Sequence, residues 1–340
     1  MPMKTIVKNL LVVVVLSLVP ATHVCAQWKY LGEFKDGLAR VRDANENWGF
    51  IDKTGKVVIP CKWFDAGSFS EGLAPVLDFT VFKRGFIDKT GKVVIPCQWK
   101  NVGFFSEGMA VVVDANDMYG FIDKTGKVVV PCQWKKTGAF REGVAVVTDT
   151  NGKCGYIDMT GKVVIPCQWV AAFDYSEGLA VVVDANGMRG FIDKTGKVAI
   201  PCKWKNTGAF HEDLSAVQDA NNNWGFIDKT GKVVISCKWK NAHNFSDGLA
   251  AVQDVQGKWG YINKTGKMVI PCKWKMAVDF SEGLAVVQDA NSKCGFIDKT
   301  GKLVIPCKWN GVGPFSNGLA QVVDANGKWG YIDKTGKVVK

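Results

Sequence analysis

Short apolar stretches alternate with small polar turns along almost the whole chain, and residues 179–193 show the pattern clearly. The valine-rich run at 179–183 is too short and too rich in β-branched residues for a helix. Asp184-Ala185-Asn186-Gly187 follows it, with Asp at the first and Gly at the fourth position of a turn. A second apolar run at 189–193 completes the pattern. These residues predict a β-hairpin.

The chain then repeats the same turn chemistry. Asp193-Lys194-Thr195-Gly196 is a second turn, and a third strand is predicted to begin at 197–200. Pro201 within that strand marks a sheet edge or a bulge, because proline cannot donate a ladder hydrogen bond. A polar return over residues 205–213 leads to the next apolar run. The unit is therefore predicted to be a three-stranded meander followed by a loop.

This unit recurs nine times. The string Gly-Phe/Tyr-Ile-Asp/Asn repeats at an interval of 36 residues once and 35 residues thereafter. A second string, close to Phe-Ser-Glu-Gly-Leu-Ala, and a third, Ile-Pro-Cys-Lys/Gln-Trp, repeat in step with it. Self-similarity at a fixed period indicates a repeat architecture. We expect an all-β array of nine antiparallel units of about 35 residues over residues 27–340, the first and last of them incomplete, with no separate catalytic domain.

Two architectures suit such an array. In an open β-solenoid or superhelix each unit contacts only its neighbours. In a closed propeller-like ring the units are blades, which typically have four strands and about 40–50 residues. The shorter period favours the open array. The ring is the alternative, since the chain ends at Lys337-Val338-Val339-Lys340 within a third strand and its Gln27-Trp28 resembles the end of one.

The first 26 residues are typical of a secretory signal peptide. Lys4 and Lys8 precede an apolar stretch over 10–19, which is too short to span a bilayer. The prediction is cleavage after Ala26 and export to the periplasm, the cell surface or the medium. Retention as a membrane anchor and lipidation at Cys25 are less favoured alternatives. No later apolar run is long enough to predict a transmembrane segment.

The segment Trp-Gly-Phe-Ile-Asp-Lys-Thr-Gly-Lys-Val-Val-Ile-Pro at 48–60 resembles the WG (also called KWG) repeat family of bacterial proteins. The resemblance extends over residues 28–339 and implies an all-β repeat protein, often exported, with no established catalytic role. The tryptophan before the glycine is present in four copies, Trp48, Trp224, Trp259 and Trp329. The others carry Arg84, Tyr119, Cys154, Arg189 and Cys294. Where the family usually has a Pro-x-Tyr-like sequence, this chain has Cys-x-Trp.

The cysteines do not have the spacing of a metal site. Ten remain after Cys25, eight of them at the repeat position, and none forms Cys-x-x-Cys. Cys154 precedes Cys167 by 13 residues, as Cys294 precedes Cys307. A two-residue turn would place each pair face to face as a disulfide, in a compartment where disulfides persist. A type I turn with a glycine bulge would shift the register by one residue and separate the sulfurs.

Aromatic residues supply the candidate ligand contacts. The spacing Ile59-x-Cys61-x-Trp63 predicts one shared strand face, on which the tryptophans form either a core ladder or an aromatic platform for a flat ligand such as a glycan. The recurring tryptophans are Trp63, Trp99, Trp134, Trp169, Trp204, Trp239, Trp274 and Trp309. The segment 78–84 departs from the repeat, and Phe79 and Phe82 within it either pack against a neighbouring unit, which is the preferred interpretation, or are candidates for a partner contact.

Charge and composition narrow the function. The net charge is +11 and the lysines cluster at turns, where they form either a solvated surface or an attraction for an anionic partner. Export makes nucleic acid an unexpected physiological target. Three histidines and the absence of hydrolase, metalloprotease or phosphate-loop motifs leave no candidate catalytic residues, cofactor or metal. The sequence predicts a non-catalytic exported scaffold that binds a protein or an anionic glycan at or outside the cell envelope. A purely structural envelope protein without a specific ligand is the alternative.

Overall fold

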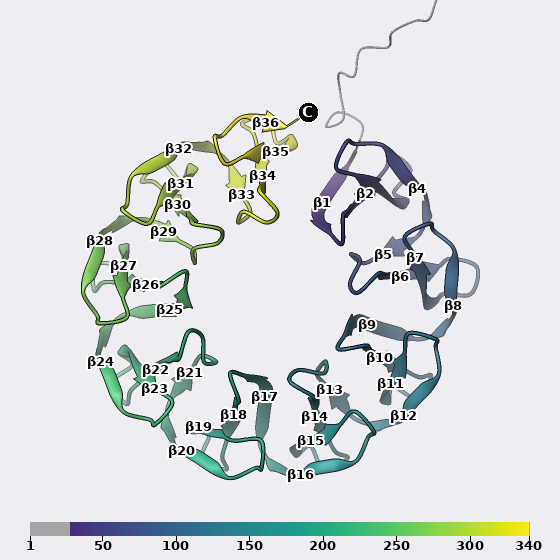
Figure 1. Ribbon diagram of the computed structural model, residues 1–340, viewed down its shortest axis with the longest axis horizontal. Coiled ribbons are helices and arrows are strands. Elements are labelled where there is room, and N and C mark those ends of the chain that lie inside the picture. Colours follow the sequence, from purple (N-terminus) through teal and green to yellow (C-terminus); the bar gives the residue numbers. More distant parts are fainter. Residues whose placement is uncertain (1–27, 340) are drawn as a thin grey trace, which may run out of the picture.

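The computed structural model describes residues 28–339, so the predicted signal peptide and Cys25 lie outside the described residues. The described chain forms nine four-stranded antiparallel sheets, each built from consecutive strands. We number these sheets as blades 1 to 9, from β1–β4 to β33–β36. The blades are arranged around a central channel, with the first strand of each nearest the channel and the fourth at the rim (Figure 1).

The first two strands of each blade line and support the channel. The innermost strands are β1 (Tyr30–Lys35), β5 (Asp65–Ala66), β9 (Asn101–Ser106), β13 (Lys136–Thr137), β17 (Ala171–Ser176), β21 (Asn206–Thr207), β25 (Asn241–Ser246), β29 (Met276–Ala277) and β33 (Gly311–Val312). The second strands are β2 (Leu38–Arg42), β6 (Leu73–Asp78), β10 (Met109–Val113), β14 (Val144–Thr148), β18 (Leu179–Val183), β22 (Leu214–Gln218), β26 (Leu249–Gln253), β30 (Leu284–Gln288) and β34 (Leu319–Val323).

The other two strands of each blade carry the most regular part of the repeat. The third strands are β3 (Trp48–Asp52), β7 (Lys83–Asp88), β11 (Tyr119–Asp123), β15 (Cys154–Asp158), β19 (Arg189–Ile192), β23 (Trp224–Asp228), β27 (Trp259–Asn263), β31 (Cys294–Asp298) and β35 (Trp329–Asp333). The outer strands are β4 (Val57–Trp63), β8 (Val93–Trp99), β12 (Val128–Trp134), β16 (Val163–Trp169), β20 (Val198–Trp204), β24 (Val233–Trp239), β28 (Met268–Trp274), β32 (Leu303–Trp309) and β36 (Val338–Val339).

The prediction of three strands and a polar return is wrong in one respect. The return itself supplies the innermost strand, as at 205–213, where Asn206 and Thr207 form β21 and pair with β22. Such a strand is hard to recognise in sequence because it is short and carries polar residues beside the channel. Its presence also explains how about 35 residues suffice for a four-stranded blade.

The recurring Asp-Lys-Thr-Gly turn joins the third and outer strands as a type I turn with a glycine bulge. In blade 1 the Gly55 amide donates to the Asp52 carbonyl at 2.9 Å, and Gly55 has a φ of +83°, which glycine adopts without strain. The Asp52 carboxylate accepts hydrogen bonds from the amide and the hydroxyl of Thr54, at 2.9 and 2.6 Å. The polar residues of the motif therefore define the turn locally.

A bulge in each complete outer strand explains the glycine of the repeated Gly-Phe/Tyr-Ile. Trp48 pairs with Trp63 and Phe50 with Ile59, so the single residue Gly49 lies opposite three residues of β4. A Cβ on Gly49 would lie 2.6 Å from the Ile59 carbonyl oxygen. Only glycine lets the two backbones approach this closely.

The core consists of nine hydrophobic clusters, each between two adjacent blades. Each interface contains an aromatic pair between the third strand of one blade and the first-strand segment of the next, for example Phe50 and Phe69 with ring centroids 4.8 Å apart. Nine blades in an open array have eight interfaces. The ninth cluster joins blade 9 to blade 1.

That closing interface makes the fold a nine-bladed β-propeller, so the preferred open array is wrong and the ring is confirmed. Tyr331 of blade 9 packs against Phe34 of blade 1, with centroids 5.3 Å apart, and its hydroxyl donates to the Gly32 carbonyl. Trp28 and Val339 pack in the same cluster. Trp28 thus takes at blade 9 the place that the Cys-x-Trp indole has in the other blades.

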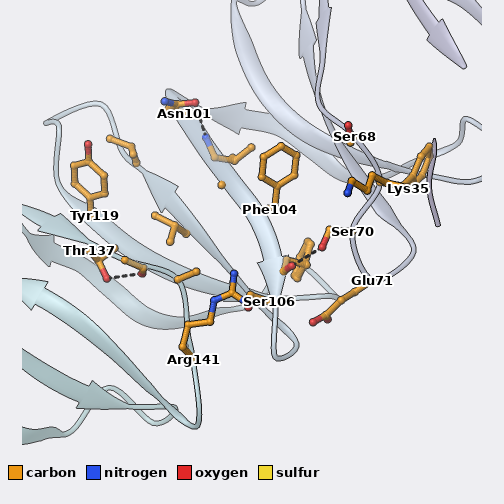
Figure 2. A pocket seen from close by; sticks show the side chains of 18 residues that line it. Lys35, Ser68, Ser70, Glu71, Asn101, Phe104, Ser106, Tyr119, Thr137 and Arg141 are labelled. Atoms are coloured by element: carbon orange, nitrogen blue, oxygen red, sulfur yellow. Dashed lines mark hydrogen bonds between the residues drawn. The ribbon is translucent and has the colours of Figure 1, made fainter. Parts of the chain in front are cut away.

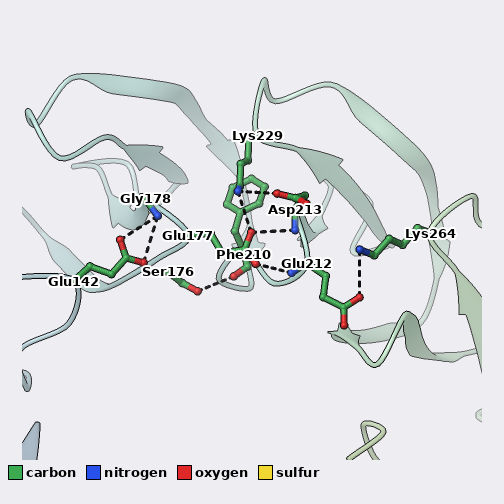
Figure 3. A network of polar contacts seen from close by, with 9 residues as sticks. All are labelled: Glu142, Ser176, Glu177, Gly178, Phe210, Glu212, Asp213, Lys229 and Lys264. Atoms are coloured by element: carbon green, nitrogen blue, oxygen red, sulfur yellow. Dashed lines mark hydrogen bonds and ion pairs between the residues drawn. The ribbon is translucent and has the colours of Figure 1, made fainter. Parts of the chain in front are cut away.

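Polar contacts also join the blades, on the face that carries the turns between first and second strands (Figure 3). The Glu177 carboxylate of blade 5 accepts hydrogen bonds from the amides of Glu212 and Asp213 of blade 6, at 2.6 and 3.0 Å. It also pairs with Lys229 at 3.1 Å. Ser176 donates to the Phe210 carbonyl at 2.7 Å. Equivalent contacts recur around much of the ring and fix neighbouring blades relative to one another.

Candidate functional site

The Cys-x-Trp tryptophans are core residues and do not form a ligand platform. Trp63, Trp134, Trp204, Trp239 and Trp309 are at most 9% exposed. Trp99, Trp169 and Trp274 are half-buried, and in all eight the indole nitrogen is shielded. They pack between blades, so the aromatic-platform interpretation is wrong.

The expected shared face of Ile59, Cys61 and Trp63 is also wrong. Ile59 and Trp63 pack against blade 2, whereas Cys61 packs on the opposite side against blade 9. The bulge opposite Gly49 reverses the side-chain direction between these residues, because each inserted residue shifts the alternation of a strand.

The cysteine pairs do not face each other. Cys154 lies opposite Trp169, and Cys294 lies opposite Trp309. Tyr156 lies opposite Ile165, a register that would place Cys154 opposite Cys167 if it continued. The bulge opposite Gly155 shifts this register and places Trp169 opposite Cys154 instead. The ten described cysteines are free thiols. Burial raises the pKa of the cysteine thiols at the repeat position, and the pKa of Cys61 rises to about 11.

The irregular tip at 78–84 is exposed and is not packed against a neighbouring blade as preferred above. Phe79 and Phe82 are 60% and 62% exposed, and their ring centroids lie 5.3 Å apart. Phe64 lies beside Phe79, with centroids 5.9 Å apart. In blade 3 the residue corresponding to Phe64 is Lys100, which pairs with Asp117. Blade 2 therefore has an aromatic patch at a location that is ionic in blade 3.

The copies differ from one another at the channel and in the turns between the second and third strands. The turn sequence Asp-Lys-Thr-Gly-Lys is identical in seven of the nine copies. By contrast, a pair of consecutive residues on or just after the innermost strand differs between most blades, chiefly at its second residue, because the first is glycine in six of the nine. Of these residues only Gly32 is buried. These pairs are Gly32-Glu33, Gly67-Ser68, Gly103-Phe104, Gly138-Ala139, Phe173-Asp174, Gly208-Ala209, His243-Asn244, Val278-Asp279 and Gly313-Pro314.

A cavity of about 760 Å³ lies on this variable surface (Figure 2). It extends over blades 2, 3 and 4 on both sides of β9, with Lys35 of blade 1 at its margin, and we call it the blade-3 hollow. Phe104 lines the side towards blade 2 and is 52% exposed. Val111, Val113 and Tyr119 line the side towards blade 4, next to Gly138 and Ala139. This size is within the range of sites for small ligands or for a few residues of a peptide.

The side towards blade 4 is open because of small residues on the innermost strands. A Cβ on Gly103 would lie 3.3 Å from Cβ of Val111, so a longer side chain there would lie over the hollow. Blade 7 has His243 at this position, stacked on Trp259 with centroids 4.8 Å apart. Blade 3 has Gly103 and Tyr119 in place of this histidine and tryptophan, so the space that the histidine ring fills in blade 7 is available to a ligand.

Arg141 supplies a positive charge at the hollow. Its place in blades 2, 3, 5, 7 and 8 is taken by a serine that donates to the carbonyl of the next blade, as Ser106 does to Phe140 at 2.9 Å. Within residues 28–339 the guanidinium of Arg141 forms no ion pair or hydrogen bond. Burial raises the pKa of the nearby Asp174 in blade 5. The positive charge of Arg141 opposes this shift, so the two side chains interact electrostatically.

The remaining charged groups of the hollow are already paired. Lys35 pairs with Glu33 at 3.2 Å. Glu71 pairs with Lys124 at 3.0 Å and accepts the Gly108 amide at 3.0 Å. Partial burial favours a higher pKa for Glu71, but these hydrogen bonds outweigh it and hold the pKa below its usual value. Arg141 is therefore the cation best able to receive a ligand.

A smaller cavity of about 350 Å³ lies at blades 6 to 8. It is lined by Trp224, Asn244 and the pair His243–Asp279, whose Nδ1 and Oδ1 atoms are 2.9 Å apart. In the described part of the chain no three His, Cys, Asp or Glu side chains are grouped as metal ligands. No helix among the described residues is long and apolar enough to cross a membrane.

Sequence reasoning missed the blade-3 hollow. Phe104 and Arg141 lie in the polar return, which was predicted to be a loop. The signal that points to them is their departure from the other copies, since Phe104 corresponds to Ala139 and Ala209 and Arg141 to serines. The sequence alone did not show that these departures lie on one surface.

Several solved structures resemble this fold at low identity. The computationally designed Ika8 protein matches with a TM-score of 0.47 and 12% identity, over 91% of this chain and 96% of that chain. BamB from Moraxella catarrhalis matches with a TM-score of 0.44 and 13% identity, over 77% and 91%. The extracellular domain of BT4673 from B. thetaiotaomicron matches with a TM-score of 0.37 and 12% identity, over 92% and 54%. Likenesses at this level carry no information on ligand or activity.

A search of curated proteins gave no match. The family model described as WG containing repeat matches residues 48–77, 85–116, 119–154, 155–187, 190–223, 224–259, 259–294, 295–329 and 329–340. These matches cover almost all of the described propeller. The chain therefore belongs to the WG containing repeat family.

Proposed function

We propose that this propeller is a non-catalytic, exported scaffold that binds a protein or an anionic glycan, at the cell envelope or outside the cell, through its channel-facing surface. The observation that carries the proposal is the location of the differences between blades. The outer strands and the Asp-Lys-Thr-Gly turns repeat nearly the same residues, whereas the innermost strands carry a different residue pair in most blades.

Physical reasoning links this distribution to binding. A purely structural ring needs only the repeated aromatic pairs, glycine-bulge turns and interblade carboxylate contacts. The exposed ring of Phe104 adds little to the core, because it is half accessible to water. Exposed aromatic and unpaired cationic side chains in a concavity are typical of recognition surfaces.

The net charge of +11 supports an acidic partner, because opposite charge accelerates association and favours correct orientation. The predicted signal peptide supports export. Deleting residues 1–26 is expected to retain the protein in the cytoplasm, and cell fractionation of the full-length and truncated proteins tests this part of the proposal.

Site-specific photocrosslinking in the source cells tests the binding surface. A benzophenone side chain is placed at Phe104, on the channel side, or at Val255, which is 82% exposed at a hairpin tip of blade 7. Both positions are accessible and neither is part of the core. The proposal predicts a discrete adduct from position 104 and none from position 255. Absence of an adduct at position 104 in an exported, folded protein would support the purely structural alternative.

A further inference from the structure

We propose that the blade-3 hollow binds an acidic peptide segment of a partner protein, with a large apolar side chain of that segment on the side towards blade 4 and a neighbouring carboxylate at Arg141. This inference rests on the proposed function and specifies the ligand class of the same surface. Three features of the hollow support it: its apolar wall, its unpaired cation and its free hydrogen-bonding groups.

The wall towards blade 4 fits an apolar side chain. Val111 and Val113 of β10 face Gly138 and Ala139 of the next blade, and Tyr119 closes the end of β11. Val111 and Tyr119 are only half-buried, so occupation by a leucine or phenylalanine side chain would remove further apolar surface from water. A sugar would instead place hydroxyl groups against valines that offer no hydrogen bonds, which is unfavourable.

The cation determines the charge of the ligand. Arg141 replaces a serine that would otherwise bond to the next blade, so the substitution gives up a structural contact and adds an exposed guanidinium. A guanidinium binds a carboxylate with two parallel hydrogen bonds. The carboxylates around it do not provide this: Glu71 is held by Lys124 and Gly108, and Asp174 attracts Arg141 electrostatically without a hydrogen bond to it.

Hydrogen-bonding groups beside the hollow suit a peptide backbone. The side-chain Oδ1 of Asn101 accepts a hydrogen bond from the Val102 amide at 2.9 Å, which leaves the side-chain NH₂ group of Asn101 to donate. The Tyr119 hydroxyl, which a tryptophan at this position would lack, can donate or accept. Together these groups flank the short strand β9 (Figure 2).

Fluorescence anisotropy with the purified protein, residues 27–340, tests the inference. The probe is a fluorescein-labelled hexapeptide that contains one phenylalanine flanked by glutamates. Control probes replace the phenylalanine with alanine or the glutamates with lysines, and a labelled oligogalacturonate represents an anionic glycan. The expected result is binding of the first probe and at least a tenfold weaker affinity for both control peptides, since each removes one of the two main contacts.

The blades themselves provide matched variants. Gly103→His introduces the residue that blade 7 has at this position and fills the hollow, whereas Gly313→His makes the same change in blade 9, where a Cβ has no neighbour closer than 3.7 Å. Arg141→Ser introduces into blade 4 the residue that blade 3 has at this position, Ser106. His211→Ser introduces the same residue at the corresponding position of blade 6. We expect G103H and R141S each to weaken peptide binding at least tenfold, and G313H and H211S to leave it unchanged.

Three results would overturn the inference: no binding of the acidic phenylalanine peptide, equal loss in G103H or R141S and its control, or R141S-sensitive binding of the oligogalacturonate without peptide binding. Thermal unfolding of each variant verifies that it is folded. If crosslinking from position 104 succeeds while the peptide fails, the ligand class is wrong and the proposed function stands. If both fail, the proposed function fails as well.

Discussion

Replacing Trp28 with alanine tests whether the ring is closed. Trp28 is the first described residue, and its indole nitrogen is shielded in the cluster that joins blades 9 and 1. Trp169 is the matched control, because it is half-buried in the same way at an internal interface between blades 4 and 5. In an open array Trp28 would lie at a free end and its loss would matter little.

The expected magnitude follows from the buried area. A tryptophan buries about 150–250 Å², and at about 25 cal/mol per Å² its removal costs roughly 4–6 kcal/mol when burial is complete. Both indoles are incompletely buried, so we expect about 3–5 kcal/mol for Trp28→Ala and for Trp169→Ala alike. Urea unfolding followed by circular dichroism measures both values.

Comparison of the two variants makes the test specific. A loss below about 1 kcal/mol for Trp28→Ala, with the full loss for Trp169→Ala, would refute ring closure, because that is the range of a surface substitution. Similar losses with an unchanged denaturant slope would support it. Small-angle scattering of the unsubstituted protein gives an independent check, since an open array is longer than a ring of the same mass.

Three further predictions concern pH, thiols and the exposed tip. Burial favours a higher pKa for Glu177, but hydrogen bonds from Lys229 and two backbone amides outweigh it and lower the pKa. The ionised Glu177 therefore stabilises the folded protein at neutral pH, and this contribution is lost as the pH falls through the pKa of Glu177 in the folded protein. Glu177→Gln should cost at most about 1 kcal/mol at pH 7 and make the melting temperature less dependent on acid pH, and equal pH dependence in both proteins would contradict this. The pKa of Cys61 is about 11, so roughly one Cys61 thiol in a thousand is ionised at pH 8. Alkylation of Cys61, followed by mass spectrometry, should therefore be at least tenfold slower in the native protein than in urea. Rapid labelling of the native protein would contradict the burial of Cys61. Phe82 is exposed and has a φ of +49°, a conformation that asparagine adopts more readily than phenylalanine. Phe82→Asn should therefore change the free energy of unfolding, measured by urea titration, by no more than about 0.5 kcal/mol. A loss above about 1.5 kcal/mol would show that the tip packs on the ring.

Features determined by neighbouring residues were predictable. The strand expected at 179–183 is β18, and the turn at 193–196 has the glycine bulge that its Asp and Gly favour. Pro201 lies on an outer strand within a bulge, which meets both interpretations of that residue. These features depend on turn chemistry and on the alternation of apolar and polar residues, which act over a few positions.

Other features depend on contacts between blades and were predicted wrongly. The tryptophans at Cys-x-Trp look the same in sequence whether they form a core or a platform, and only the approach of the next blade buries Trp204 to 7% exposure. The bulge beside Gly190 sends Cys202 and Trp204 to opposite faces, although their spacing predicts one face. The innermost strands were missed because β21 has only two paired residues.

The all-β repeat, its nine units and the local turns can be read from the amino-acid sequence, because a fixed period and turn chemistry act between residues that are close in the chain. Closure of the units into a ring and the shared surface of the variable residues depend on packing between blades, which joins residues far apart in the chain. Closure depends on the ninth interface, where Trp28 and Tyr331 meet across almost the whole chain length. The blade-3 hollow likewise depends on Gly103, Phe104 and Arg141, which come from two blades and are brought together by packing between them.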